Sequence, residues 1–131
     1  MTTKIKDLGE IELLNRLKRF MKCGQIDDDI AEINATKKSL LINTDLLVDK
    51  IHFSEEISCA KDIGWKCITS NISDLICSGS ENIMSFTVGL VLPSNTAWKW
   101  VENLYEGMSE AMQEFGGEII GGDCSCGETK M

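Results

Sequence analysis

A chain of 131 residues, with 43% hydrophobic and 26% charged side chains, is long enough for one folded domain with its own core. Its formal net charge of −8 argues against a nucleic acid as the direct partner, because that binding depends on Lys and Arg. The longest apolar stretch has about half the length that a membrane span needs. Without the apolar core of a signal peptide, the chain is expected to be cytoplasmic, with its six cysteines as free thiols.

The first 45 residues are predicted to contain a packing helix followed by a β-hairpin. Apolar side chains recur at helical spacing over residues 11–21. Two strands are expected at Ile30–Ile33 and Leu40–Thr44, because apolar runs flank a turn-like segment. This hairpin is expected to bring the acidic loop Asp27–Asp29 back beside Asp45, at the end of the second strand.

A second helix is predicted from Ala60 to Ser78, ended by Gly79. Its apolar side is expected to hold Trp65, Ile68, Ile72, Leu75 and Ile76. The opposite side is a stripe of small polar residues, formed by Cys67, Asn71, Asp74 and Ser78. The helix is therefore expected to pack on the core with one side and to present Asp74 on the other.

The last part of the chain is predicted to form a strand, a helix and a short strand. A strand over residues 83–92 ends at Pro93 and places alternate side chains on one side, namely Met84, Phe86, Val88, Leu90 and Leu92. The helix runs from residue 94 or 95 to residue 115, and its apolar side comprises Val101, Leu104, Tyr105, Met108, Ala111, Met112 and Phe115. A short strand at Glu118–Ile120 is expected to end in Gly121-Gly122-Asp123.

Acidic side chains stand at the ends of several predicted elements or on the polar stripe of the second helix. They are Asp27–Asp29, Asp45, Asp74 and Asp123. Clustered carboxylates with hydroxyls and a single histidine suit hard, oxygen-preferring cations such as Mg²⁺ better than zinc or copper. Gly121-Gly122 leaves backbone amides open to a phosphate group. Each acidic residue alone is more often solvated surface, so the hypothesis rests on their combination.

The order of these motifs resembles the N-terminal half of thiamine-monophosphate kinases, within the ATP-binding superfamily of aminoimidazole ribonucleotide synthetase. The resemblance extends over nearly all of the chain. The motifs that carry it are Leu8-Gly9-Glu10, Ile26–Asp29, Asn43–Val48, His52-Phe53, Gly64-Trp65-Lys66, Asn71–Leu75, Gly79 and Gly121-Gly122-Asp123. The segments around Asp45 and Asp74 are the most specific, because other members of the superfamily carry them in different forms.

The resemblance implies an α+β domain, in which a mixed β-sheet has helices packed on one face and pairs with the sheet of a second subunit in a homodimer. It also implies a kinase that uses ATP and several Mg²⁺ ions to phosphorylate thiamine monophosphate, giving thiamine diphosphate. No side chain is expected to act as acid, base or nucleophile. The acceptor phosphate is already ionised at neutral pH, and positioning with charge neutralisation does most of the catalysis in phosphoryl transfer.

The same resemblance implies roles for individual residues. The implied magnesium ligands are Asp29, Asn43, Thr44, Asp45, Asp74 and Asp123. The implied nucleotide contacts are Asp28, Gly121, Gly122 and Asp123. His52 is expected to contact the substrate. The chain departs from the usual residues of the family at Asp27, Asn43 and Cys126, and at the last of these the family carries a cation near the phosphates.

Residues 1–131 are expected to form a single N-terminal domain that binds ATP and magnesium, in a truncated chain that lacks the family's C-terminal domain and so holds half of the site. Two alternatives remain open. One is a non-catalytic dimerisation or metal- and nucleotide-binding module. The other is a different ATP-dependent enzyme of the superfamily, such as selenophosphate synthetase or aminoimidazole ribonucleotide synthetase. Stabilisation by magnesium with an ATP analogue distinguishes a retained nucleotide site from an inert module.

Overall fold

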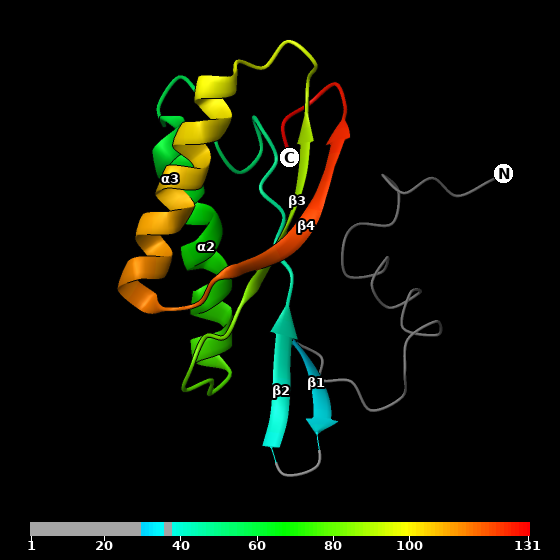
Figure 1. The fold of residues 1–131 in the computed structure, drawn as a ribbon, viewed down its shortest axis with the longest axis vertical. Helices are drawn as coiled ribbons and strands as arrows, with labels where there is room; N and C mark the ends of the chain where they lie inside the picture. Colours follow the sequence, from blue (N-terminus) through cyan, green and yellow to red (C-terminus); the bar gives the residue numbers. More distant parts are fainter. Residues whose placement is uncertain (1–29, 36–37) are drawn as a thin grey trace, which may run out of the picture.

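The computed structural model describes residues 30–35 and 38–131. The predicted helix over residues 11–21 and the loop Asp27–Asp29 lie outside the described residues. The elements follow one another as β1 (Ile30–Ala35), β2 (Lys38–Asn43), α2 (Ala60–Cys77), β3 (Phe86–Leu92), α3 (Trp98–Phe115) and β4 (Ile119–Cys126) (Figure 1).

The predicted hairpin is confirmed. β1 and β2 pair in antiparallel fashion, with Ile30 opposite Asn43 and Ala35 opposite Lys38. β2 ends at Asn43, one residue before the expected end, and the chain then continues without regular structure. Thr44 and Asp45 therefore follow the strand directly, and both are exposed.

α3 connects two parallel strands. β3 and β4 pair with Phe86 opposite Ile119 and Leu92 opposite Cys126, and parallel neighbours require a long crossover of this kind. α2 and α3 lie on the same side of this pair (Figure 1). The predicted α+β class with helices on one face is confirmed. The described strands form two two-stranded sheets, one antiparallel and one parallel, where a single mixed sheet was expected.

The end of α2 agrees with the prediction. Gly79 has a φ of 88°, a left-handed conformation that glycine adopts without steric cost. Its N–H donates to the Ile76 carbonyl at 2.9 Å, and the Ser80 N–H donates to the Leu75 carbonyl at 2.9 Å. This pair of bonds closes the helix and satisfies carbonyls that would otherwise lack a partner. The position of Asp74, one turn before the end, is thereby well defined.

The start of α3 differs from the prediction. The helix begins at Trp98 because Pro93 opens a turn, in which the Thr96 N–H donates to the Pro93 carbonyl at 3.0 Å. Residues 94–96 therefore belong to the turn, and Ala97 is the N-cap of the helix.

One hydrophobic core joins α2, α3 and β3. Its buried members are Phe53, Ala60, Ile63, Ile68, Ile72, Leu90, Leu104, Met108 and Ala111. Two predicted core residues of α3 are corrected, because Tyr105 and Phe115 are exposed. Ile76 and Met84, predicted on the apolar sides of their elements, are exposed as well. Met84 precedes β3, while Ile76 and Phe115 lie at helix ends, where less of the neighbouring element covers them. The periodicity of apolar residues does not show how far along a helix the neighbouring element buries it.

Two buried glycines allow the backbones of α2 and α3 to touch. A Cβ atom added to Gly64 would lie 1.9 Å from the Leu104 carbonyl oxygen. A Cβ atom added to Gly107 would lie 1.9 Å from the Lys61 carbonyl oxygen. Real Cβ atoms do not approach an oxygen so closely. Glycine at both positions is therefore a condition of this helix crossing.

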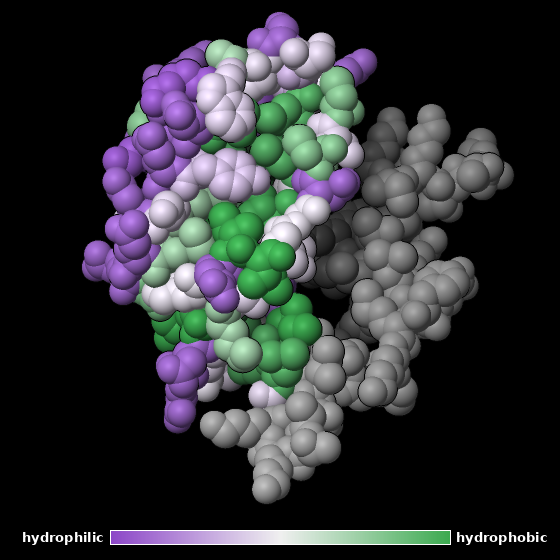
Figure 2. All heavy atoms as spheres, in the orientation of Figure 1, coloured by the Kyte–Doolittle hydropathy of each residue, from purple (hydrophilic) through white to green (hydrophobic). Residues whose placement is uncertain are grey.

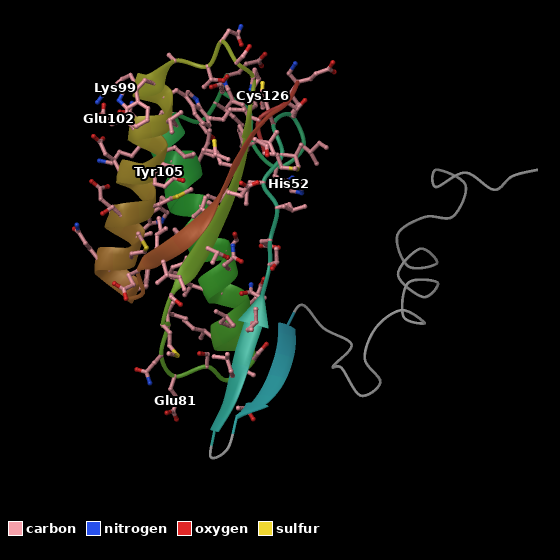
Figure 3. The ribbon with its side chains drawn as sticks, turned by 45° about the vertical axis from the view of Figure 1, so that its right-hand side comes forward. His52, Glu81, Lys99, Glu102, Tyr105 and Cys126 are labelled. Atoms are coloured by element: carbon pink, nitrogen blue, oxygen red, sulfur yellow. The ribbon has the colours of Figure 1, made fainter. Side chains whose placement is uncertain are left out.

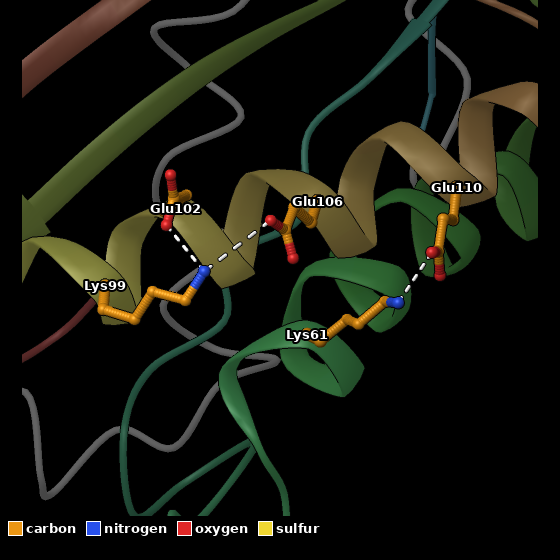
Figure 4. Close-up of polar contacts among 5 residues, drawn as sticks. All are labelled: Lys61, Lys99, Glu102, Glu106 and Glu110. Carbon is orange, nitrogen blue, oxygen red and sulfur yellow. Dashed lines mark hydrogen bonds and ion pairs between the residues drawn. The ribbon is translucent and has the colours of Figure 1, made fainter.

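Charged side chains lie at the same crossing (Figure 4). Lys61 of α2 forms an ion pair with Glu110 of α3 at 2.6 Å, and the hydrogen bond to Glu110 raises the pKa of Lys61. Both side chains are about half exposed, so solvent screens the pair and its effect on stability is small. The crossing thus depends on packing at the glycines rather than on this charge pair.

The two sides of the molecule differ in polarity. Polar residues cover the outer side of α3, whereas apolar residues gather over the strands (Figure 2). Ile120 of β4 is one of the exposed large hydrophobic residues, with 64% of its area accessible. Within residues 30–35 and 38–131, neither helix has the length and hydrophobicity needed to cross a membrane.

Candidate functional site

The end of β2 is fixed against the polar stripe of α2. The Asn43 side-chain amide donates to a carboxylate oxygen of Asp74 and to the Asn71 carbonyl oxygen, both at 3.3 Å. The Asp45 backbone N–H donates to the Asn71 side-chain oxygen at 3.2 Å. The Asn71 amide in turn donates to the Cys67 carbonyl at 2.9 Å. Residues about 30 positions apart in sequence therefore meet at one place.

This junction has the donor atoms of a magnesium site. Asn43 and Asp74 are half-buried and share a hydrogen bond, while Asp45 and Thr44 are exposed beside them. Burial raises the pKa of the Cys67 thiol, and the negative charge of Asp45 raises it further. Carboxylate, amide and hydroxyl oxygens suit Mg²⁺, which binds through a few protein ligands together with phosphate oxygens and water. The residue types at the junction fit that ion.

The structure does not gather all the predicted ligands. No three His, Cys, Asp or Glu side chains in the described part of the chain lie close enough to hold one metal ion together. Asp123 accepts a hydrogen bond from the Ser125 hydroxyl at 3.4 Å instead of joining Asp45 and Asp74 in such a group. Asp28 and Asp29 lie outside the described residues.

Gly121-Gly122-Asp123 does not stand at the end of a strand, as expected, but inside one. β4 continues to Cys126, and Gly122 lies opposite Val88 while Asp123 lies opposite Gly89. A Cβ atom on Gly122 would lie 2.0 Å from the Val88 carbonyl oxygen, so the close pairing of the two strands requires glycine there. At Gly121 nothing lies within 4 Å of the same position. The side of Gly121 on which a side chain would project is therefore open space.

A small cavity of about 60 Å³ lies between the junction and the core. Its walls come from the segment after β2, both helices and β3, and its polar lining residues are Asp45, Cys67 and Lys130. A drug-sized ligand needs a pocket of roughly 300 Å³ or more. The cavity is thus too small for a nucleotide.

Lys130 is a cation at this cavity that sequence reasoning missed. Its ammonium group lies 2.6 Å from a carboxylate oxygen of Glu55 and 4.6 Å from the centre of the Trp100 ring. The side chain is only 16% exposed. A cationic side chain near the site was expected to be missing, because Cys126 stands where the family carries a cation. No local sequence pattern marks Lys130, which reaches the cavity through the tertiary fold.

His52, the predicted substrate contact, lies on an exposed turn after β2 (Figure 3). Its Nδ1 atom accepts a hydrogen bond from the Val48 N–H at 3.0 Å. Its carbonyl oxygen accepts one from the Lys66 ammonium group at 2.6 Å. Lys66 belongs to α2, so one helix contacts both the His52 turn and the end of β2.

A family model described as AIR synthase related protein, N-terminal domain, matches residues 27–130 of the chain. The match includes all the strands and helices described above. The chain belongs to this family.

Relatives within the AIR synthase related family show which enzymes the chain is similar to. Thiamine-monophosphate kinase of Prochlorococcus marinus is 52% identical over 126 residues, covering 96% of this chain and 38% of that protein. The enzyme of the same name from Synechococcus elongatus is 34% identical, covering 92% of this chain and 37% of that protein. The predicted resemblance to thiamine-monophosphate kinases is confirmed. The chain spans less than two fifths of the length of these two relatives.

Solved structures agree with this membership of the AIR synthase related family. The structure of AaThiL complexed with AMPPCP and TMP superimposes with a TM-score of 0.89 at 30% identity, covering 99% of this chain and 41% of that chain. The thiamine monophosphate kinase of Aquifex aeolicus superimposes with a TM-score of 0.81 at 29% identity, covering 98% of this chain and 41% of that chain. The fold described here is therefore that of the N-terminal domain of the family.

Proposed function

We propose that this chain forms the N-terminal half of a kinase site, in which the γ-phosphoryl group of ATP is transferred to thiamine monophosphate to give thiamine diphosphate. The observation that carries the proposal is the junction of Asn43 and Asp45 with Asn71 and Asp74, where oxygen donors from two elements meet. Similarity to thiamine-monophosphate kinases, and to AaThiL complexed with AMPPCP and TMP, supports the choice of substrates.

In the proposed site, magnesium is held by Asn43, Thr44, Asp45 and Asp74 at the junction, together with Asp29 and Asp123. When bound, several Mg²⁺ ions would offset the repulsion between two phosphate-bearing substrates. The side chains themselves act by holding and orienting. Asn43 donates to Asp74, which leaves the second carboxylate oxygen of Asp74 as an acceptor for a ligand.

The proposed nucleotide contacts are Asp28, Gly121, Gly122 and Asp123. Support comes from the open space beside Gly121 on the exposed strand β4. A backbone amide without a neighbouring side chain can approach a phosphate closely. His52 is proposed to contact thiamine monophosphate, as an exposed donor on the turn that follows the junction.

The test is thermal unfolding of the chain with magnesium and AMPPCP together and with each alone. At concentrations of about 100 times the dissociation constant, the pair is expected to raise the Tm by roughly 5–10 °C. Either component alone is expected to give a much smaller shift, because each contributes part of the coordination sphere. Addition of thiamine monophosphate to the complex is expected to raise the Tm again.

Asp45→Asn serves as the matched variant for this test. The substitution keeps the shape of the side chain and the backbone bond to Asn71, so the Tm without ligand is expected to stay within a few degrees of the unmodified chain. The shift with magnesium and AMPPCP is expected to disappear. Equal shifts in both proteins would refute a role of Asp45 and place the binding away from the junction. No shift in the unmodified chain would favour the inert module.

A homodimer is proposed to form through the exposed apolar surface over the strands (Figure 2). Apolar patches on folded proteins commonly mark contacts with other chains, and Ile120 of strand β4 is 64% exposed. Sedimentation of the chain is expected to show a dimer, and Ile120→Glu is expected to shift it to the monomer. A monomer at all concentrations in the unmodified chain would contradict this assembly.

The domain organisation follows from the same proposal. Residues 1–131 are proposed to act as the ATP- and magnesium-binding domain, and a cytoplasmic location is proposed with it. The two relatives described above are more than twice as long as the part that this chain matches. A second domain, corresponding to the part of these relatives that the chain does not match, is proposed to supply the remaining contacts to both substrates.

A further inference from the structure

The turn that carries His52 is closed by a set of backbone contacts. The His52 and Ile51 N–H groups both donate to the Val48 carbonyl, at 2.9 and 3.1 Å. The Lys50 N–H donates to the Phe53 carbonyl at 2.8 Å, and Lys50 has a φ of 63°. Phe53 is buried in the core and so anchors the end of the turn. A left-handed residue other than glycine is uncommon and requires such support.

The same turn orients the imidazole ring. The Nδ1 atom accepts the Val48 N–H at 3.0 Å, and an accepting nitrogen carries no proton. The neutral ring therefore bears its proton on Nε2. Because His52 is exposed, the Nε2–H group is available as a hydrogen-bond donor to an oxygen of a bound molecule.

Lys66 ties this turn to α2. Its ammonium group donates to the His52 carbonyl at 2.6 Å, a charge-assisted bond between residues 14 positions apart. α2 also carries Asn71 and Asp74, which hold the end of β2. The helix therefore fixes both ends of the segment from Asn43 to His52.

We propose that Lys66 is a positioning residue that holds the His52 turn so that the Nε2–H group faces an oxygen acceptor on the substrate at a fixed distance from the Asn43–Asp74 junction. The acceptor is a phosphate oxygen, because all the oxygen atoms of thiamine monophosphate belong to its phosphate ester. The part that concerns the substrate rests on the proposed function, whereas the part that concerns the turn does not.

The first experiment measures amide hydrogen exchange of Val48, whose N–H donates to the His52 ring. In Lys66→Met this amide is expected to exchange about 10-fold faster or more, because a hydrogen bond from a charged group is lost. Lys66→Arg is expected to restore slow exchange, since it can still donate to the carbonyl. Lys99→Met, which removes an exposed lysine paired with Glu102 on α3, is the control and is expected to leave Val48 unchanged.

The Met108 amide, in the middle of α3, reports whether the variants remain folded. Its exchange is expected to be equal in all four proteins. If Val48 exchanges at the same rate in Lys66→Met as in the unmodified chain, while Met108 stays protected, Lys66 does not hold the turn and the proposal fails.

The second experiment follows the imidazole nitrogen signals of His52, the single histidine of the chain, during titration with thiamine monophosphate and magnesium. Lys66→Met is expected to weaken binding about 10-fold, and Lys66→Arg is expected to recover most of it. Equal affinity in all variants would overturn the role of Lys66 toward the substrate. A His52 signal that never responds to thiamine monophosphate would overturn the proposed substrate contact, while the exchange of Val48 would still decide the role of Lys66 in the turn.

Discussion

Gly64→Ala and Gly107→Ala are each expected to lower the free energy of unfolding by about 3 kcal/mol, at the upper end of what overpacking costs in a core. In both variants the new methyl group would lie 1.9 Å from a carbonyl oxygen of the opposite helix. The contact is between backbones, so no side-chain rotation can relieve it. α2 and α3 must move apart, which opens gaps around Leu104 and Met108.

Urea unfolding of the two variants and of Gly89→Ala measures this effect. Gly89 lies in β3 with nothing within 4 Å of its Cβ position, so its replacement is expected to change stability by less than about 0.5 kcal/mol. The double variant Gly64→Ala/Gly107→Ala is expected to lose less than the sum of the two, because the helices separate only once. Variants as stable as Gly89→Ala would show that the crossing tolerates the added atoms.

Asp74→Asn is expected to reduce the affinity for magnesium with AMPPCP by roughly 100-fold, since even residues that merely support a metal ligand cost 10- to 100-fold when replaced. The asparagine oxygen can still accept the Asn43 amide hydrogen, so the junction is expected to persist. The expected change in unfolding free energy is therefore below about 0.5 kcal/mol. Titration calorimetry gives the affinity, and urea unfolding gives the stability.

Glu81→Gln is the matched control for the loss of one negative charge. Glu81 is exposed, lies in the segment after α2, and is well separated from His52 in the view of Figure 3. Its replacement is expected to leave nucleotide binding unchanged. If Asp74→Asn binds as tightly as Glu81→Gln, then Asp74 serves only as a partner of Asn43 and the proposed magnesium site loses its central ligand.

The junction of β2 with α2 could be anticipated from local patterns. The apolar run of β2 ends in Asn-Thr-Asp, and helical spacing places Asn71 and Asp74 on one stripe. Such periodicities arise because one face of an element is buried. They can be recognised from residues that are close together in the sequence. The prediction for Asp123 was less accurate, because the Gly-Gly pair suggested the end of a strand. β4 continues through these glycines, since they allow its backbone to lie close to Val88.

By itself, the sequence determined the order of the elements from β1 to β4, the α+β class, the hairpin, the end of α2 at Gly79 and the family resemblance, because each of these depends on residues close together along the chain. The tertiary structure alone decided that Gly64 and Gly107 lie at the helix crossing, that Lys66 donates to the His52 carbonyl, and that Lys130 lies at the cavity beside Asp45. These contacts join residues far apart in sequence. They depend on how the helices cross and how the loops return, which no local pattern specifies.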